Sequence, residues 1–160
     1  FKTGRMSAVG VASGAVAGLV AITPASGFTG VLGALLIGIG AGGLCYIAVY
    51  LRTKIKLDDA LEVFAVHGVG GIWGALATGI FAVASIGGTA GLIEGNAGQM
   101  VDQLIAVVAT MVYSFVMTLV ILKVLDIIPG LGLRMSPEEE DQGMDISAHG
   151  ERAYINDGAD

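Results

Sequence analysis

The chain has 160 residues, of which 54% are hydrophobic and only 14% charged, and it contains 26 glycines. Soluble globular domains carry about 25% charged residues and roughly 7% glycine, so this composition argues against a soluble domain. Three prolines without a Gly-X-Y repeat exclude collagen, and a net charge of −6 argues against a nucleic-acid partner. A helical membrane protein remains, in which glycine lets helices approach closely. The chain starts at Phe1 without a signal peptide, so we expect part of a longer protein.

Charged residues and turn residues divide the chain into four predicted membrane spans. No charged residue lies between Arg5 and Arg52, which leaves room for two spans of about 20 residues each. The Pro-Gly segment 23–27 marks a turn between those two spans. The same pattern of uncharged stretches continues after Arg52. Four helices are therefore predicted, at 6–22, 28–51, 57–83 and 100–125.

The last part of the chain has a different composition. Residues 134–160 are acidic and poor in large apolar side chains, so we predict a membrane region at 1–133 and an aqueous tail at 134–160. All eight Lys and Arg fall on the same side of the four-helix order, with three of them in the predicted loop 52–57. The Gly-rich segment 84–99, predicted to be a loop, has none. Because cytoplasmic loops carry excess Lys and Arg, the tail is predicted to be cytoplasmic and the Gly-rich loop to face outward.

Small residues recur at every fourth position in three of the predicted helices. The three series are Gly10-Gly14-Gly18, Ala34-Gly38-Gly42 and Gly70-Gly74. We interpret each series as a face where two helices pack closely. The alternative is that the glycines leave room for a narrow conduit, and spacing does not separate the two interpretations.

His67 is the main candidate for a functional residue. It is predicted to lie about ten residues into the third helix, where an ionisable group normally faces a cavity, a pore or a partner. At α-helical spacing, Val63, His67, Gly71, Gly74 and Thr78 share one face. A neutral imidazole has one donor and one acceptor nitrogen, so it suits relaying a proton or holding a small polar substrate.

Three acidic residues precede this histidine. Asp58 or Asp59 can cap the start of the third helix, and Glu62 stands at capping-box spacing from Asp59. We expect these carboxylates to pair with Lys54 and Lys56 in the preceding loop. The alternative is that they form a cytoplasmic vestibule for cations.

The sequence gives no support for enzymatic chemistry. Cys45 is the only cysteine, which excludes an internal disulfide and a cysteine-based metal site. The only other histidine, His149, lies in the tail, and no nucleophile-elbow, Walker or zinc-protease motif is present. We therefore expect no catalytic residue, no metal and no cofactor. Trp73 is interpreted as a packing residue or an interfacial anchor.

Four stretches of the sequence have a specific pattern of residues, and they follow one another in a specific order and spacing. They are residues 13–27, the block DDALEVFAVHGVGG at 58–71, residues 78–82, and the tail segments 132–134 and 143–154. Together they resemble the ammonium transporter family (Amt/Mep/Rh). The resemblance implies the last four of about eleven helices of a homotrimeric plasma-membrane protein, in which each subunit has its own narrow hydrophobic pore.

The resemblance also implies roles for individual residues. Ammonium would be recognised outside and lose its proton, and ammonia and the proton would pass inward along two hydrogen-bonded histidines, the second of which matches His67. Val63 and Val16 would line the pore. Asp59 matches an aspartate at the cytoplasmic helix start, and Glu62 stands where the family usually has Asp.

The tail resembles a regulatory C-terminus that docks under the subunits and cooperates with PII-type signal proteins. The residues that carry this likeness are Gly143, Asp145, Ser147, His149, Gly150 and Tyr154. In some relatives a hydroxyl at the position of Ser147 is phosphorylated. The alternative function is an ammonium sensor of the same fold that signals through its tail, and a membrane enzyme with His67 as a base ranks last.

Overall fold

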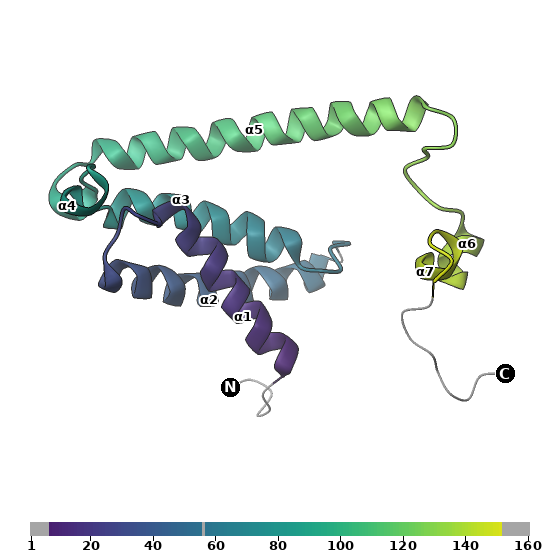
Figure 1. Cartoon of the computed structure of the whole chain (residues 1–160), viewed down its shortest axis with the longest axis horizontal. Coiled ribbons are helices and arrows are strands. Elements are labelled where there is room, and N and C mark those ends of the chain that lie inside the picture. Colours follow the sequence, from purple (N-terminus) through teal and green to yellow (C-terminus); the bar gives the residue numbers. More distant parts are fainter. Residues whose placement is uncertain (1–6, 56, 152–160) are drawn as a thin grey trace. The chain divides into compact units, whose positions relative to one another are not determined.

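The structure, a computed structural model, describes residues 7–55 and 57–151. Every regular element in these ranges is a helix, in agreement with the predicted all-α class. Four of the helical segments are long and apolar enough to cross a membrane: Ala8–Ala25, Val31–Ile55, Phe64–Phe81 and Gly98–Ile127. The chain divides into two compact units, residues 1–111 and 112–160, and each is described by itself (Figure 1).

The first unit holds the first three long helices and the connections between them. Its elements are α1 (Ala8–Ile22), the 3-10 turn η1 (Thr23–Ala25), α2 (Val31–Ile55), the π-turn η2 (Phe64–Gly68), α3 (Val69–Phe81), α4 (Ala84–Gly87) and the 3-10 turn η3 (Leu92–Glu94). Helix α5 (Gly98–Ile127) begins in this unit and ends in the second one. The second unit continues with α6 (Pro137–Gln142) and α7 (Met144–Ser147).

Helix α2 starts and ends later than the predicted span 28–51. Its start is delayed because the carbonyl of Phe28 accepts a hydrogen bond from Val83 N–H (2.8 Å) and the Thr29 hydroxyl donates to Phe81 O (2.9 Å). The helix continues through Arg52 and Lys54 to Ile55. The prediction that residues 52–55 belong to a loop is therefore wrong. Basic side chains favour the last turn of a helix because they complement the negative end of its dipole.

The predicted start of the third helix is also wrong. Residues 57–62 are not α-helical, and the helical segment begins only at the π-turn Phe64–Gly68. Glu62 has a φ of 57°, in the left-handed region that interrupts a right-handed helix. At its other end, α3 stops at Phe81, close to the predicted Val83.

The core of the first unit lies where α1, α2 and α3 pack together (Figure 1). Its fully buried side chains are Ala21, Ala25, Ile37, Ala41 and Ala77, with Trp73 packed against them. The Trp73 indole N–H donates to Ile37 O (2.9 Å), and the absent side chain of Gly40 makes room for its ring. Trp73 is therefore a packing residue between α2 and α3.

Only one of the three predicted small-residue series packs against a neighbouring helix within the described residues. A Cβ on Gly74 would collide with the backbone of Ala21, and one on Gly70 would lie 3.3 Å from Cys45 Sγ. In contrast, a Cβ on Gly14 or Gly38 would meet no atom within 4 Å. Helix α1 instead turns its Ala17 and Ala21 side chains inward, because a methyl group is already small enough for this contact.

The segment 84–99, predicted to be a loop, is folded. It contains α4 and η3, which are followed by Gly88 and Gly95 as C-caps with φ values of 78° and 91°. The Glu94 carboxylate accepts a hydrogen bond from Ala84 N–H (2.7 Å) and so ties the two short elements together. Beyond it, α5 extends slightly past both ends of the predicted helix 100–125, and none of its residues is buried among the described ones.

Candidate functional site

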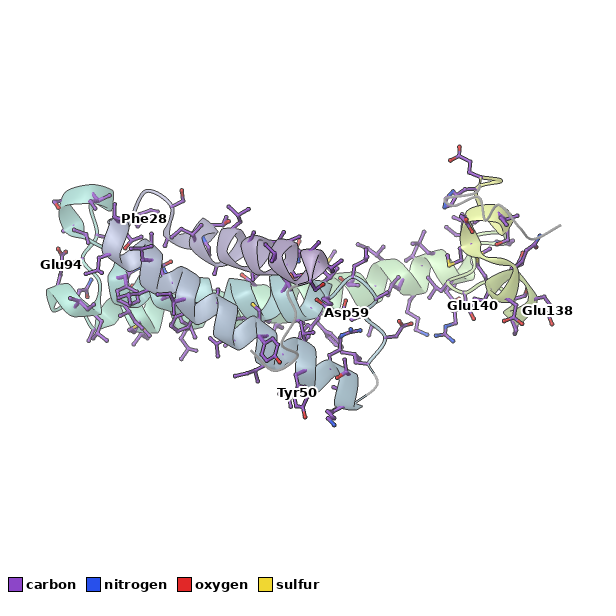
Figure 2. All side chains as sticks on the ribbon, turned by 90° about the horizontal axis from the view of Figure 1, so that it is seen from below. Phe28, Tyr50, Asp59, Glu94, Glu138 and Glu140 are labelled. Carbon is purple, nitrogen blue, oxygen red and sulfur yellow. The ribbon has the colours of Figure 1, made fainter. Side chains whose placement is uncertain are left out.

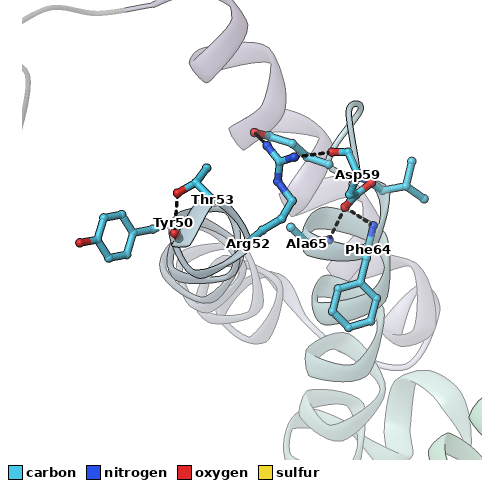
Figure 3. Close-up of polar contacts among 8 residues, drawn as sticks. Tyr50, Arg52, Thr53, Asp59, Phe64 and Ala65 are labelled. Carbon is cyan, nitrogen blue, oxygen red and sulfur yellow. Dashed lines mark hydrogen bonds and ion pairs between the residues drawn. The ribbon is translucent and has the colours of Figure 1, made fainter. Parts of the chain in front are cut away.

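The Asp59 side chain organises the start of the third membrane helix. Its carboxylate accepts hydrogen bonds from the backbone N–H groups of Val63 (2.8 Å), Phe64 (3.0 Å) and Ala65 (3.5 Å) (Figure 3). The first N–H groups of a helix have no carbonyl partner within the helix, and an acidic side chain there also complements the helix dipole. The cap is therefore made by Asp59, and the structure records no such bond for Asp58.

Arg52 connects this cap to the end of α2. Its Nη1 donates to the backbone carbonyl of Asp59 at 2.8 Å, and its Nη2 lies 3.7 Å from Glu62 Oε1. The two side chains of this ion pair are largely shielded, with 20% and 27% of their surfaces exposed. From the sequence, Arg52 contributes only to the predicted membrane orientation. Its position just after an apolar stretch and just before an acidic segment could have indicated an ion pair.

Glu62 does not act as the capping-box partner that the sequence predicts. In a capping box the Glu carboxylate would bond back to the backbone N–H of the capping residue. Here the Glu62 carboxylate pairs with Arg52, while Glu62 N–H donates to Asp59 O (3.0 Å) in a tight turn. Glu62 stands at positive φ (57°) in this turn. The expected partner Lys54 lies over the Tyr50 ring instead (5.4 Å), and Lys56 lies outside the described residues.

His67 lies within the π-turn, in the first turn of the helical segment. Val69 N–H reaches back to Phe64 O, five residues earlier, and also to Val66 O. π-turns contain one residue more per turn than an α-helix and recur at functional sites. His67 itself is exposed among the described residues, whereas its neighbour Val66 is buried.

The depth of His67 follows from the contact between Val66 and α2. Cys45 Sγ lies 3.7 Å from Val66 O, so the two residues are at the same level. At 1.5 Å per residue, Cys45 is about 15 Å from the Ile55 end of α2 and about 21 Å from its Val31 end. The expectation that His67 is about ten residues into its helix is wrong, but His67 still lies well inside the apolar length of α2.

The irregular backbone before the π-turn also lies alongside α2. Asp59 is level with Arg52, and the chain reaches the level of Cys45 by Val66. Non-helical backbone at membrane depth is tolerated where it is buried in protein or lines a water-filled cavity. The hydrogen bonds from Arg52 to the Asp59 carbonyl and from residues 63–65 to the Asp59 carboxylate satisfy part of the polar groups of segment 57–62.

The helix face predicted to run from Val63 to Thr78 is exposed in its first part and buried in its last part. Val63 and His67 are exposed, while Gly74 and Thr78 are buried against α1 or within α3. The predicted face assumed a continuous α-helical period, which the π-turn interrupts. Val16 is 40% exposed on α1, so the apolar side chains of Val16 and Val63 are both available to residues outside the described chain.

A groove of about 300 Å³ lies between α1, α2 and the π-turn. Small residues of both helices line it together with Glu62, Tyr46 and Val66. Neither His67 nor Val16 contributes to its lining, so this groove does not bring the predicted path residues together.

The tail motif forms two short helices in the second unit. Ser136 caps α6 and forms a full capping box with Glu139, and the hydrogen bonds from Ser136 lower the pKa of the Glu139 carboxyl. The Ser147 hydroxyl donates to Gly143 O (2.9 Å). Gly143 joins α6 to α7 with a φ of 98°, which only glycine adopts readily.

The remaining tail residues follow α7. Gly150 has a φ of 67°, and its N–H donates to Ile146 O (3.0 Å). Asp145 O accepts from Glu151 N–H (2.9 Å), and His149 is exposed. Tyr154 lies outside the described residues.

Comparison with known proteins gives a consistent result over the chain. The family model described as "Ammonium Transporter Family" matches residues 1–154. The chain is 48% identical to ammonium transporter Amt1 of Archaeoglobus fulgidus over 151 residues, which are 94% of this chain and 38% of that relative. It is 50% identical to an ammonium transporter of Aquifex aeolicus over 155 residues, 96% of this chain and 36% of that relative.

Solved structures agree with the sequence comparison. The crystal structure of Saccharomyces cerevisiae Mep2 matches with a TM-score of 0.82 at 36% identity, over 100% of this chain and 37% of that chain. Candida albicans Mep2 matches with a TM-score of 0.78 at 36% identity, over 86% of this chain and 32% of that chain. The chain thus spans about a third of the length of these relatives, from 32% to 38%.

Proposed function

The chain belongs to the ammonium transporter family, and from this premise we propose that it forms the part of a transporter subunit that carries one histidine of the ammonium path. The observation that carries the proposal is the position of His67. It lies on a π-turn at the level of Cys45, inside the apolar length of α2, and it is exposed on the described chain. An ionisable side chain at such a depth requires a polar partner or a conduit.

The proposed path separates ammonium into ammonia and a proton. Ammonium would lose its proton on the outer side, and neutral ammonia would pass between apolar side chains that offer nothing to stabilise a charged ion. Val16 and Val63, both exposed and apolar, are proposed to line this path. His67, as the second histidine of the path, would accept the proton on one ring nitrogen from a first histidine outside this chain and release one from the other nitrogen toward the inner side.

The larger assembly is proposed on the same family premise. We place the chain as the last four of the eleven helices of a subunit, in a homotrimer embedded in the plasma membrane with ammonium or ammonia as its substrate. The collection of Lys and Arg on one side supports a cytoplasmic C-terminus. The two short helices α6 and α7, which follow the apolar helix α5, support a regulatory tail, for which a PII-type signal protein is the proposed partner.

The experiment is ammonium transport by the full-length protein in proteoliposomes. Replacing His67 by Ala is expected to abolish or strongly alter the ammonium-dependent current, because the proton would lose its carrier. The control is Ala97→Ser, at an exposed position of segment 84–99, which is expected to leave the current unchanged. An unaltered current in correctly assembled His67→Ala protein would exclude the proposed role.

A further inference from the structure

We propose that Arg52 is a positioning residue for transport, which holds the segment 57–62 against α2 and thereby fixes the π-turn that presents His67. The inference rests on the proposed function, in which His67 carries a proton. Arg52 would act on His67 indirectly. The Arg52 guanidinium contacts the Asp59 carbonyl and the Glu62 carboxylate, and no contact with His67 is part of the proposed role.

The first step of the inference is the geometry of the guanidinium. Two of its nitrogens reach two different acceptors, Asp59 O at 2.8 Å and Glu62 Oε1 at 3.7 Å. The third nitrogen, Nε, is buried and has no hydrogen-bond partner among the described residues. A lysine amine concentrates its charge at one point, whereas the planar fork of arginine can reach two acceptors at once. Arg52 therefore suits the joining of two separate groups of one turn.

The second step is the strain that the ion pair holds in place. Glu62 is the only described non-glycine residue at positive φ, a conformation that persists where surrounding contacts enforce it. The contacts that act here are the ion pair with Arg52 and the turn hydrogen bond to Asp59 O. Arg52 and Glu62 also meet at Asp59, because the Asp59 carbonyl accepts a hydrogen bond from the Arg52 side chain and one from Glu62 N–H.

The third step connects Asp59 to His67. The Asp59 carboxylate holds the N–H groups of residues 63–65, which directly precede and open the π-turn. If Asp59 is released, the turn can relax to an α-helical register. Removing the extra residue of a π-turn changes the orientation of the preceding residues relative to α3 by about 100°. A side chain in this turn would then no longer face the same direction.

The test uses the full-length protein and two measurements. Arg52→Gln is expected to reduce the maximal ammonium transport rate per folded protein about tenfold, since misplacing a reacting group by an ångström can cost up to about a hundredfold. The ammonium concentration at half-maximal rate is expected to stay within about twofold of the wild-type value, because substrate recognition is proposed for the opposite side. Hydrogen exchange of the amides of residues 63–65 is expected to be about tenfold faster, because they lose their fixed carboxylate acceptor.

The control is Lys54→Gln, which removes a neighbouring basic residue that contacts the Tyr50 ring and not the segment 57–62. It is expected to leave both measurements unchanged. Arg52→Lys keeps the charge but not the fork, and is expected to resemble Arg52→Gln in the exchange of residues 63–65. Wild-type exchange in Arg52→Lys would overturn the role of the fork.

The outcomes separate this inference from the proposed function. If the wild-type protein transports ammonium and Arg52→Gln has unchanged transport, the positioning role is overturned, whatever its amide exchange. If the wild-type protein does not transport ammonium, the proposed function fails, and amide exchange in Arg52→Gln still decides whether Arg52 fixes the turn. Should Arg52 variants not fold, Glu62→Gln is expected to speed the same exchange about twofold, and an unchanged rate would contradict the inference.

Discussion

The two ends of the third membrane helix are fixed in different ways. At its C-terminal end, called the outer end after the proposed topology, Val83 N–H bonds to the Phe28 carbonyl and the short elements of segment 84–99 turn at glycines, with Glu94 as the one carboxylate involved. At its N-terminal end, called the inner end after the same proposal, Arg52 and the Asp59 carboxylate hold a segment of irregular backbone. Figure 2 shows Phe28 and Glu94 near one end of the first unit and Asp59 toward the other.

The outer end is held by close packing, and the inner end is held by charged side chains. The outer contacts are mainly backbone hydrogen bonds and close approaches to glycine, which tolerate little added volume. The inner contacts are side-chain hydrogen bonds and an ion pair, which single substitutions remove without creating a clash. We infer that the outer end determines the stability of the unit and that the inner end determines how the π-turn is held.

Of the two ends, the outer end is expected to show the larger effect on stability, for Gly91→Ala. The φ of Gly91 is −94°, which any residue adopts, so the cost is steric. The added Cβ would lie 2.8 Å from Ala82 N and 2.8 Å from Ile80 O, and these backbone atoms have no freedom to turn away. Overpacking of this kind is expected to lower the free energy of unfolding by about 2–3 kcal/mol.

A denaturant titration of the full-length protein in detergent measures this loss. Ala97→Ser, at an exposed position of the same segment, is the control and is expected to change the free energy of unfolding by less than about 0.5 kcal/mol. Equal stability of Gly91→Ala and wild type would mean that the outer end is not packed as described.

A smaller effect is expected at the inner end, for Asp59→Ala. The variant removes the acceptor for three backbone N–H groups, and loss of such a cap costs about 1–2 kcal/mol. Asp58→Ala is a closely matched control, because it removes the adjacent, exposed carboxylate and leaves the cap in place. The same titration measures both variants. If the two substitutions cost the same, the stability comes from the charge of the segment and not from the hydrogen bonds of Asp59.

The sequence predicts the membrane helices best where their boundaries are marked by residues that end a helix. Helix α1 ends at Ile22, as predicted, because Pro24 and Gly27 follow. The sequence predicts a start of the third helix at Leu57, but residues 57–62 are not α-helical. The structure shows that Asp59 caps from outside the helix.

The candidate site is predicted in part. His67 is found from sequence because it is ionisable and lies within a long apolar stretch. Three features are not predicted: the π-turn that carries His67, the positive φ of Glu62, and the contacts of Arg52 with Asp59 and Glu62. None of these three features has a local sequence pattern, since each depends on how segment 57–62 meets a helix that lies before it in the chain.

We infer that Arg52 and Asp59 hold the π-turn, and with it His67, at the level of Cys45. The decisive measurement is an experimental structure of the full-length protein in a lipid environment, at a resolution that shows backbone carbonyls. We expect Val66 O to face Cys45 Sγ and the Asp59 carboxylate to contact the N–H groups of residues 63–65. An uninterrupted α-helix from Leu57 to Phe81, with no widened turn at His67, would contradict it.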